Sequence, residues 1–332
     1  MKSLDIKPPE HQRRALRIVV GCAVVFVVLV IASIACATYL FTAPFSLYQD
    51  EEHGSGEGDV THNGTQSRRA VRSFFEVADE GEQRVKADIE LALGHVTIST
   101  AEQGALFQVE GVVIGTQLRP RFDHGRNGDE VEISLSLDGE DVSFRGLRGM
   151  RGSNWQLYFS DSIPLDLDLT LGAAEGDLNF TGIPVENLSV ECGMASISLR
   201  FDEPNPVVLH RLDIEAGLSE FTARGLGNAR FESFEFDGGA GEFTLDFSGE
   251  AFMPGAEAEI NVGLASLTVL LPLGQPVVVE APVSFMTRVE FPESFKRIGR
   301  DSWASPNAAG NPHTFHIEID AGPGSIEVKL VE

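Results

Sequence analysis

The stretch that decides the fold is residues 212–223, LDIEAGLSEFTA, because its pattern returns along the chain. Apolar and polar residues alternate in it on both sides of one small residue, Gly217. The copies place the following small residues at that same position: Gly94, Ala174, Gly193, Gly239, Gly263 and Gly322. Copies of one pattern at intervals of roughly two dozen residues are typical of a repeat architecture.

Alternation with period two predicts strands with one inward face, and a small residue between two such strands suits a tight corner. A single copy cannot bury its own apolar face, but stacked copies can. The sequence therefore predicts an all-β protein, a β-solenoid whose coils of roughly 20–24 residues add about 4.8 Å each along the axis. An up-and-down β-barrel is the alternative, but it needs hairpin turns, which are scarce between the central copies.

Composition limits the classes of partner. The chain has 332 residues, 42% of them hydrophobic, which is enough for a core in one or two domains. Its 50 acidic and 25 basic residues give a net charge of −25. This charge repels nucleic acid and anionic lipid, and it favours cations or basic protein surfaces. A solvated acidic exterior is the simpler interpretation.

An almost uncharged stretch at residues 18–45 is long enough to cross a bilayer as a helix. Basic residues precede it and acidic residues follow it, so we expect residues 1–17 in the cytoplasm. A cleaved signal peptide and lipidation at Cys36 are the alternatives. Residues 46–70 are rich in glycine and acids and predict a flexible tether.

Residues 71–332 are then expected to form the solenoid domain. The repeat register is lost over about residues 100–164, which predicts irregular coils or a strand-rich cap, and regular coils follow over about 165–290. The copy at 315–330 is expected to end the stack. Residues 145–152, RGLRGMRG, are the basic cluster of this region, and pairing with the protein's own carboxylates is their simplest role.

Stacked coils turn single acidic residues into columns about 4.8 Å apart. One predicted column holds Asp213, Glu235 and Glu259, and the other holds Glu191, Glu215 and Asp237. Like charges at that spacing repel, and a divalent cation such as Ca²⁺ would relieve the repulsion. The chain lacks the nonapeptide repeat of calcium-binding solenoids, so screening by solvent is the default interpretation.

No set of residues predicts catalysis or a cofactor. A glycosidase or lyase on such a scaffold needs paired carboxylates beside aromatic platforms, but Trp and Tyr are missing from residues 165–279. His313 and His316 are three apart, so on a strand they would point to opposite faces and could not share a metal ion. Cys192, one of three cysteines, is predicted to be a buried free thiol.

The copies at residues 258–281 and 315–330 resemble the repeats of bacterial toast-rack domains. That group includes the C-terminal domain of LiaF-type cell-wall-stress proteins and related adhesin-like repeat families. The resemblance spans residues 85–330, weakest between 100 and 165, and rests on the small-residue pairs Gly263/Ala265 and Gly322/Gly324, on Leu271-Pro272 and on Ser305-Pro306.

The resemblance implies a single-stranded right-handed β-helix at a bacterial envelope and no shared catalytic residues. LiaF-type proteins restrain a membrane histidine kinase and usually carry several membrane segments, whereas this chain has one apolar segment. We therefore expect a non-enzymatic protein of the bacterial inner membrane whose solenoid outside the cytoplasm binds an envelope protein. We predict the binding face at Asp213, Glu215, Glu235, Asp237 and Glu259. An adhesin, a carbohydrate-active enzyme and end-to-end self-association through the last coil remain open.

Overall fold

The computed structural model describes residues 70–331 except 115–118, 139–152 and 282–285. Nearly every element in these ranges is a strand, and the short helix α3, Leu226–Ala229, is the exception. No helix in the described ranges is long and apolar enough to cross a membrane. The predicted membrane segment at 18–45, most of the tether and the basic cluster at 145–152 lie outside the described residues.

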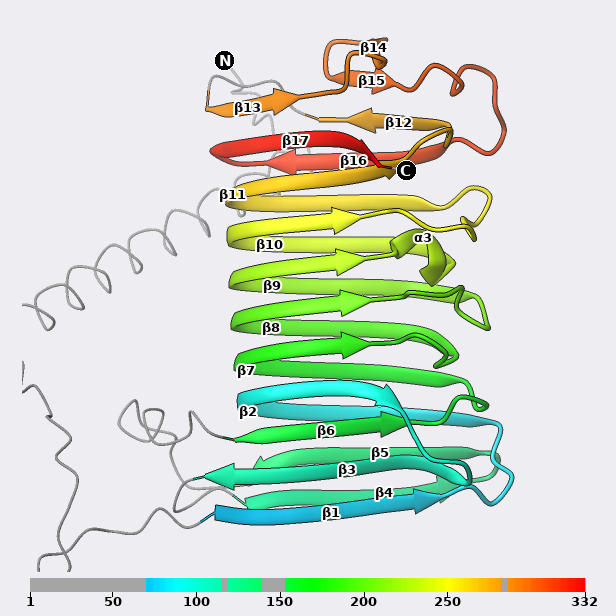
Figure 1. The fold of residues 1–332 in the computed structure, drawn as a ribbon, viewed down its shortest axis with the longest axis vertical. Coiled ribbons are helices and arrows are strands. Elements are labelled where there is room, and N and C mark those ends of the chain that lie inside the picture. The colour runs from blue at the N-terminus through cyan, green and yellow to red at the C-terminus, as the bar shows by residue number, and fades with distance from the viewer. Residues whose placement is uncertain (1–69, 115–118, 139–152, 282–285, 332) are drawn as a thin grey trace, which may run out of the picture. The chain divides into compact units, whose positions relative to one another are not determined.

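Within the described ranges, seventeen strands join into one mixed sheet (Figure 1). Their bounds, in chain order, are β1 Ala70–Ala78, β2 Arg84–Thr100, β3 Ala105–Ile114, β4 Arg119–Asn127, β5 Glu130–Asp138, β6 Asn154–Phe159, β7 Leu165–Asn179, β8 Val185–Arg200, β9 Leu209–Arg224, β10 Phe231–Asp246, β11 Glu257–Pro272, β12 Val277–Glu280, β13 Thr287–Glu290, β14 Lys296–Arg297, β15 Ser302–Ala304, β16 Phe315–Ala321 and β17 Gly324–Val331.

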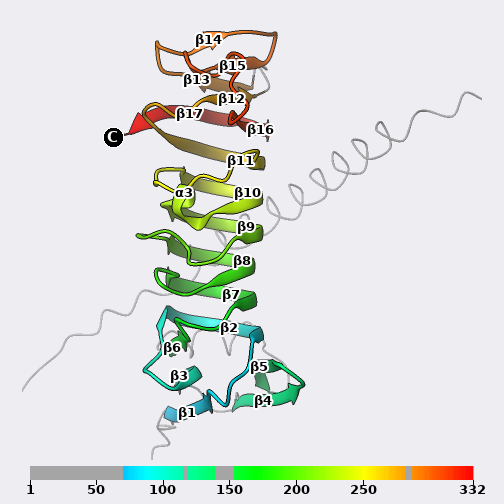
Figure 2. The same ribbon diagram turned by 90° about the vertical axis from the view of Figure 1, so that its right-hand side faces the viewer.

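The middle of the sheet is a stack of parallel coils. β2, β7, β8, β9, β10 and β11 pair in that order, each parallel to the next. Figure 2 shows these coils layer on layer. Each of these strands is 15 to 17 residues long and folds over at one edge, on the left of Figure 1. A strand thus has a first arm before the bend and a second arm after it, and the stack has the coiled form that a solenoid predicts.

The chain departs from coil-after-coil winding at both ends of the stack. Strands β1 and β3 to β6 form a strand-rich cap with three antiparallel ladders, β1–β3, β3–β6 and β4–β5, while β5 and β6 also run parallel to β2. At the other end, β16 and β17 lie between β11 and the pair β12 and β13. The prediction that residues 315–330 end the stack is therefore wrong, because β12 and β13 form the layer beyond them.

The small corner residues of successive coils form a continuous column, but its members in β2 and β7 differ from those predicted. A Cβ built on Gly217 would stand 2.6 Å from the carbonyl oxygen of Gly193, and Gly239, Gly263 and Gly322 each meet the preceding glycine in the same way. Gly193 meets Gly172, however, and Gly172 meets Ala92. Placing Gly94 and Ala174 in the Gly217 column is wrong by two residues, although these two residues do pair with each other.

Inward side chains of both arms form one core along the stack. Phenylalanines fill much of it: Phe180 stacks on Phe201 with ring centroids 5.6 Å apart, and Phe247 lies 5.2 Å from Phe315 of β16. Cys192 is buried and free, as predicted. Burial, and after it the charge of Glu191, raises the pKa of its thiol to about 11, so the residue behaves as a small apolar side chain.

Candidate functional site

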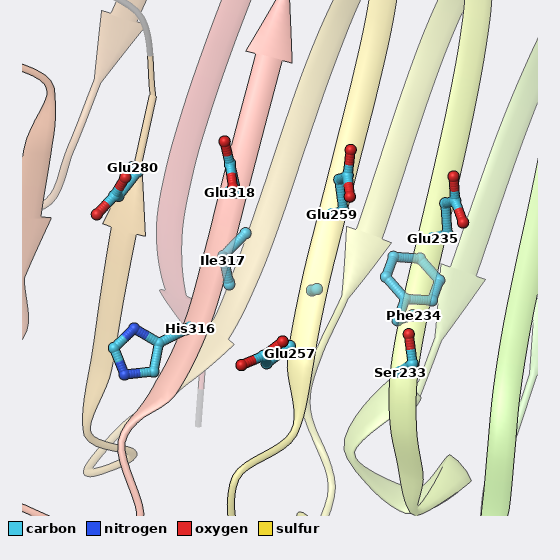
Figure 3. A pocket seen from close by; sticks show the side chains of 10 residues that line it. Ser233, Phe234, Glu235, Glu257, Glu259, Glu280, His316, Ile317 and Glu318 are labelled. Carbon is cyan, nitrogen blue, oxygen red and sulfur yellow. The ribbon is translucent and has the colours of Figure 1, made fainter. Parts of the chain in front are cut away.

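The first arms carry an acidic column at a distance from the bend. The strand register places Asp213 opposite Glu235, and Glu235 opposite Glu259. This confirms the predicted stacking and extends it, because Glu318 of β16 follows Glu259 and Glu280 of β12 follows Glu318. Figure 3 shows four of these carboxylates in a row across the strands. The bend-distal column is therefore Asp213, Glu235, Glu259, Glu318 and Glu280.

A second column lies two residues nearer the bend. Glu191 stands opposite Glu215, and Glu215 opposite Asp237, as predicted. Asn261 and Asp320 continue this bend-proximal column towards β16. Glu90 and Thr170 continue the column in the other direction, because Thr170 pairs with both Glu90 and Glu191.

Among the described residues, arginine pairs with the bend-distal column at its Asp213 end only. The Nε of Arg211 lies 2.5 Å from Oδ2 of Asp213, and its Nη2 lies 3.7 Å from Oε2 of Glu235. No described arginine or lysine pairs with Glu259, Glu318 or Glu280. Three carboxylates in successive layers, none with a described basic partner, give this end a strongly negative potential at neutral pH.

Glu235 is in the middle of this field. Burial raises the pKa of its carboxyl, and the neighbouring charges of Asp237, Asp213 and Glu259 raise it further, against the opposing effect of Arg211. Protonation of Glu235 would relieve the repulsion along both columns. A cationic group of a partner would do the same at neutral pH.

A pocket of about 310 Å³ opens beside this column. Glu235, Glu257, Glu259, Glu280 and Glu318 line it together with His316, which Figure 3 places on the strand next to Glu257. Its lining contains neither Trp nor Tyr, and its one aromatic residue, Phe234, is buried, so the described lining offers no exposed aromatic platform for a sugar ring. Among the described residues, no three His, Cys, Asp or Glu side chains are arranged to hold a metal ion. His313 lies in the loop before β16, away from this lining.

Sequence reasoning missed the polar side chains that hold successive coils together opposite the bend. Asn205 is 1% exposed, and its amide donates to the carbonyls of Val185 and Ala229 at 2.8 and 3.2 Å. Its Oδ1 accepts the Val185 N–H at 3.1 Å. The turns differ in length and composition from coil to coil, so no repeated sequence signal marks such a residue.

Residues 65–222 match the family described as the N-terminal domain of toast_rack, DUF2154. This segment is therefore similar to toast-rack N-terminal domains. The resemblance recognised from the sequence is therefore confirmed, although its clearest carriers, residues 258–281 and 315–330, lie beyond the matched toast-rack segment. The irregular stretch 100–164, where the resemblance is weakest, lies inside it.

Solved structures with low sequence identity resemble the chain. A candidate cell adhesion protein from Clostridium sporogenes is 17% identical with a TM-score of 0.45, covering 79% of this chain and 100% of its own. A candidate adhesin from Bacteroides fragilis is 9% identical with a TM-score of 0.32, covering 79% and 98%. No curated protein matches the sequence at a significant level.

Proposed function

We propose that the chain is a non-enzymatic protein of the bacterial cell envelope that binds a protein partner through its acidic face. The acidic face consists of the bend-distal column together with Glu191, Glu215 and Asp237. The observation that carries the proposal is the register of these columns, which aligns carboxylates over successive coils without a matching set of basic residues in the part of the chain that the structure describes. A surface so charged is suited to recognising a basic partner rather than to holding a small substrate.

The apolar segment 18–45 would fix the protein in the cytoplasmic membrane with residues 1–17 inside. Behind a tether at 46–70, a right-handed single-stranded solenoid would present the acidic face outside the cytoplasm. Anchoring raises the local concentration of the face near membrane-bound partners. A partner in the same membrane therefore suits this arrangement better than a freely diffusing one.

Zero-length carbodiimide crosslinking in intact envelope membranes tests the proposal, because this reagent joins carboxylates directly to the amines of a partner. The full chain should give a discrete crosslinked species. The variant D213N/E215Q/E235Q/D237N/E259Q should lose at least about nine-tenths of it, as expected when several charge-assisted contacts are removed.

The matched control neutralises five exposed acids away from the acidic face, E102Q/E110Q/E132Q/D161N/E203Q. It removes the same charge and should retain the crosslinked species. Equal crosslinking by the two variants would show that the acidic face is only a solvated surface. An adhesin would instead give no species in its own membranes and would bind a foreign surface.

A further inference from the structure

The bend of the stack carries a line of four apolar side chains, three of them exposed and the fourth, Ala240, half-buried. Met194, Leu218, Ala240 and Leu264 each follow the corner glycine of their coil, and the register places them opposite one another in four successive coils. Met194, Leu218 and Leu264 are 55%, 43% and 57% exposed. We call these four residues the apolar ridge. Single exposed apolar residues are ordinary on a protein surface, but a contiguous row marks an interaction site.

Carboxylates border the apolar ridge on both sides. On the first arms run Glu191, Glu215 and Asp237 of the bend-proximal column. On the second arms Glu220 and Glu242, two residues after Leu218 and Ala240, stand opposite each other and are exposed. The ridge is thus an apolar strip between two negative strips, and its chemical complement is an apolar stripe between two positive ones.

The spacing of successive coils along the stack is close to the rise of one turn of an α-helix. Neighbouring strands are about 4.8 Å apart, so Met194 and Leu264 are separated by about 14 Å along the stack. A helix rises about 5.4 Å per turn, and its i, i+4 and i+7 residues form a stripe of comparable spacing. Lysine or arginine on each side of that stripe would reach the two negative strips.

We infer that the apolar ridge is the docking site for a basic amphipathic helix of the envelope partner. The inference rests on the proposed function and names the class of segment that the partner would supply. A second copy of this chain fits worse, because two ridges face to face would bring the acidic strips together. An anionic membrane surface is repelled by the same strips.

A synthetic probe tests the inference on the full chain held in phosphatidylcholine nanodiscs. The probe is a helical peptide of about 18 residues, long enough to be helical in water, with a leucine stripe flanked by lysines. We expect fluorescence anisotropy to show saturable binding that weakens as salt rises. The variant L218N/L264N should bind it at least about tenfold more weakly, because two buried leucine contacts are lost.

Leu273 and Ile298 provide the matched control, since they are 60% and 61% exposed and lie off the ridge. L273N/I298N should bind the probe as the unchanged chain does. E220Q/E242Q should weaken binding and reduce its salt dependence, although neither residue belongs to the acidic face. A scrambled peptide of the same composition should bind poorly, because its stripe is broken.

Equal binding of the probe by L218N/L264N, or equal binding of the scrambled peptide, would overturn the inference. Dimerisation of the chain in sedimentation that L218N/L264N abolishes would assign the ridge to self-association instead. Attachment to anionic vesicles lost in that variant would assign it to lipid. If the carbodiimide species persists in L218N/L264N, the acidic face stands and the ridge alone is wrong. If that species is absent while the probe still binds, the proposed function is wrong and the ridge stands.

Discussion

At the bends from Gly193 to Gly322, a Cβ added to the corner glycine would stand 2.3–2.8 Å from a carbonyl oxygen of the neighbouring layer. For Gly239 that distance is 2.6 Å, to the oxygen of Gly217. Real Cβ atoms do not approach backbone oxygen so closely, and the backbone of a stacked coil has no room to withdraw. The small residue is thus required by the spacing of the layers rather than by local turn chemistry.

This close approach predicts that G239A destabilises the fold by about 2–3 kcal/mol, the usual effect of overpacking. The matched control is G125A on β4, where an added Cβ has no atom within 4 Å, and it should be neutral or slightly stabilising. Thermal melts of the full chain measure both variants. A melting point for G239A equal to that of G125A would contradict the observed contact.

Cys192 gives a second prediction at the residue scale. Its buried thiol has a pKa of about 11, so almost no thiolate is present at pH 8. In a C22S/C36S background, the native chain should not react with a disulfide reagent over hours, and it should react fully once guanidinium unfolds it. Rapid reaction of the native chain would place the thiol at the surface.

At the scale of the strand, much of the stack could be predicted from the sequence because alternation and small corner residues repeat in β8 to β11. Two departures from this regular stacking could not be predicted from the sequence. In β2 and β7 the motif is shifted by two residues, so Gly94 and Ala174 imitate a corner that Ala92 and Gly172 occupy. Strands β12 and β13 form a layer beyond β16 and β17, an insertion that no linear pattern reports.

The candidate site likewise contains residues that the repeat pattern predicts and residues that it does not. Asp213, Glu235 and Glu259 could be aligned in advance because they share a position in adjacent copies. Glu280 could not, because β12 is too short to show the repeat. The apolar ridge had a signal that was overlooked, since Met194, Leu218 and Leu264 each follow the corner glycine directly.

The bend-distal column predicts a pH dependence. The pKa of Glu235 is raised in the fold, so the folded chain binds more protons than the unfolded chain between about pH 4.3, the ordinary glutamate value, and the raised value. Stability therefore falls as pH rises through that window. E235Q should be more stable than the unchanged chain at pH 7, and the difference should vanish below pH 4.

Thermal melts across this range measure the effect, with E203Q on an exposed loop as the control that should follow the unchanged chain. A destabilising effect of E235Q at neutral pH would mean that the contact with Arg211 outweighs the repulsion from the three neighbouring carboxylates.

At the scale of the whole molecule, the net charge of −25 governs the response to ions. Salt screens repulsion over distances beyond about 10 Å at 0.1 M, so the melting point should rise with added NaCl. CaCl₂ at matched ionic strength should give the same rise, because the described carboxylates form no cluster able to hold a metal. A saturable extra increase with calcium would show that the columns bind cations.

The measurement that tests the central claim most directly is site-specific photocrosslinking in cells that make the full chain. A photoreactive residue is placed at 215, 218 or 259, on or beside the acidic face, and at 102, 132 or 203 elsewhere on the domain. The account predicts a discrete adduct of one mass from the first three positions and none from the others. Adducts from the second set alone, or none from any position, would contradict it.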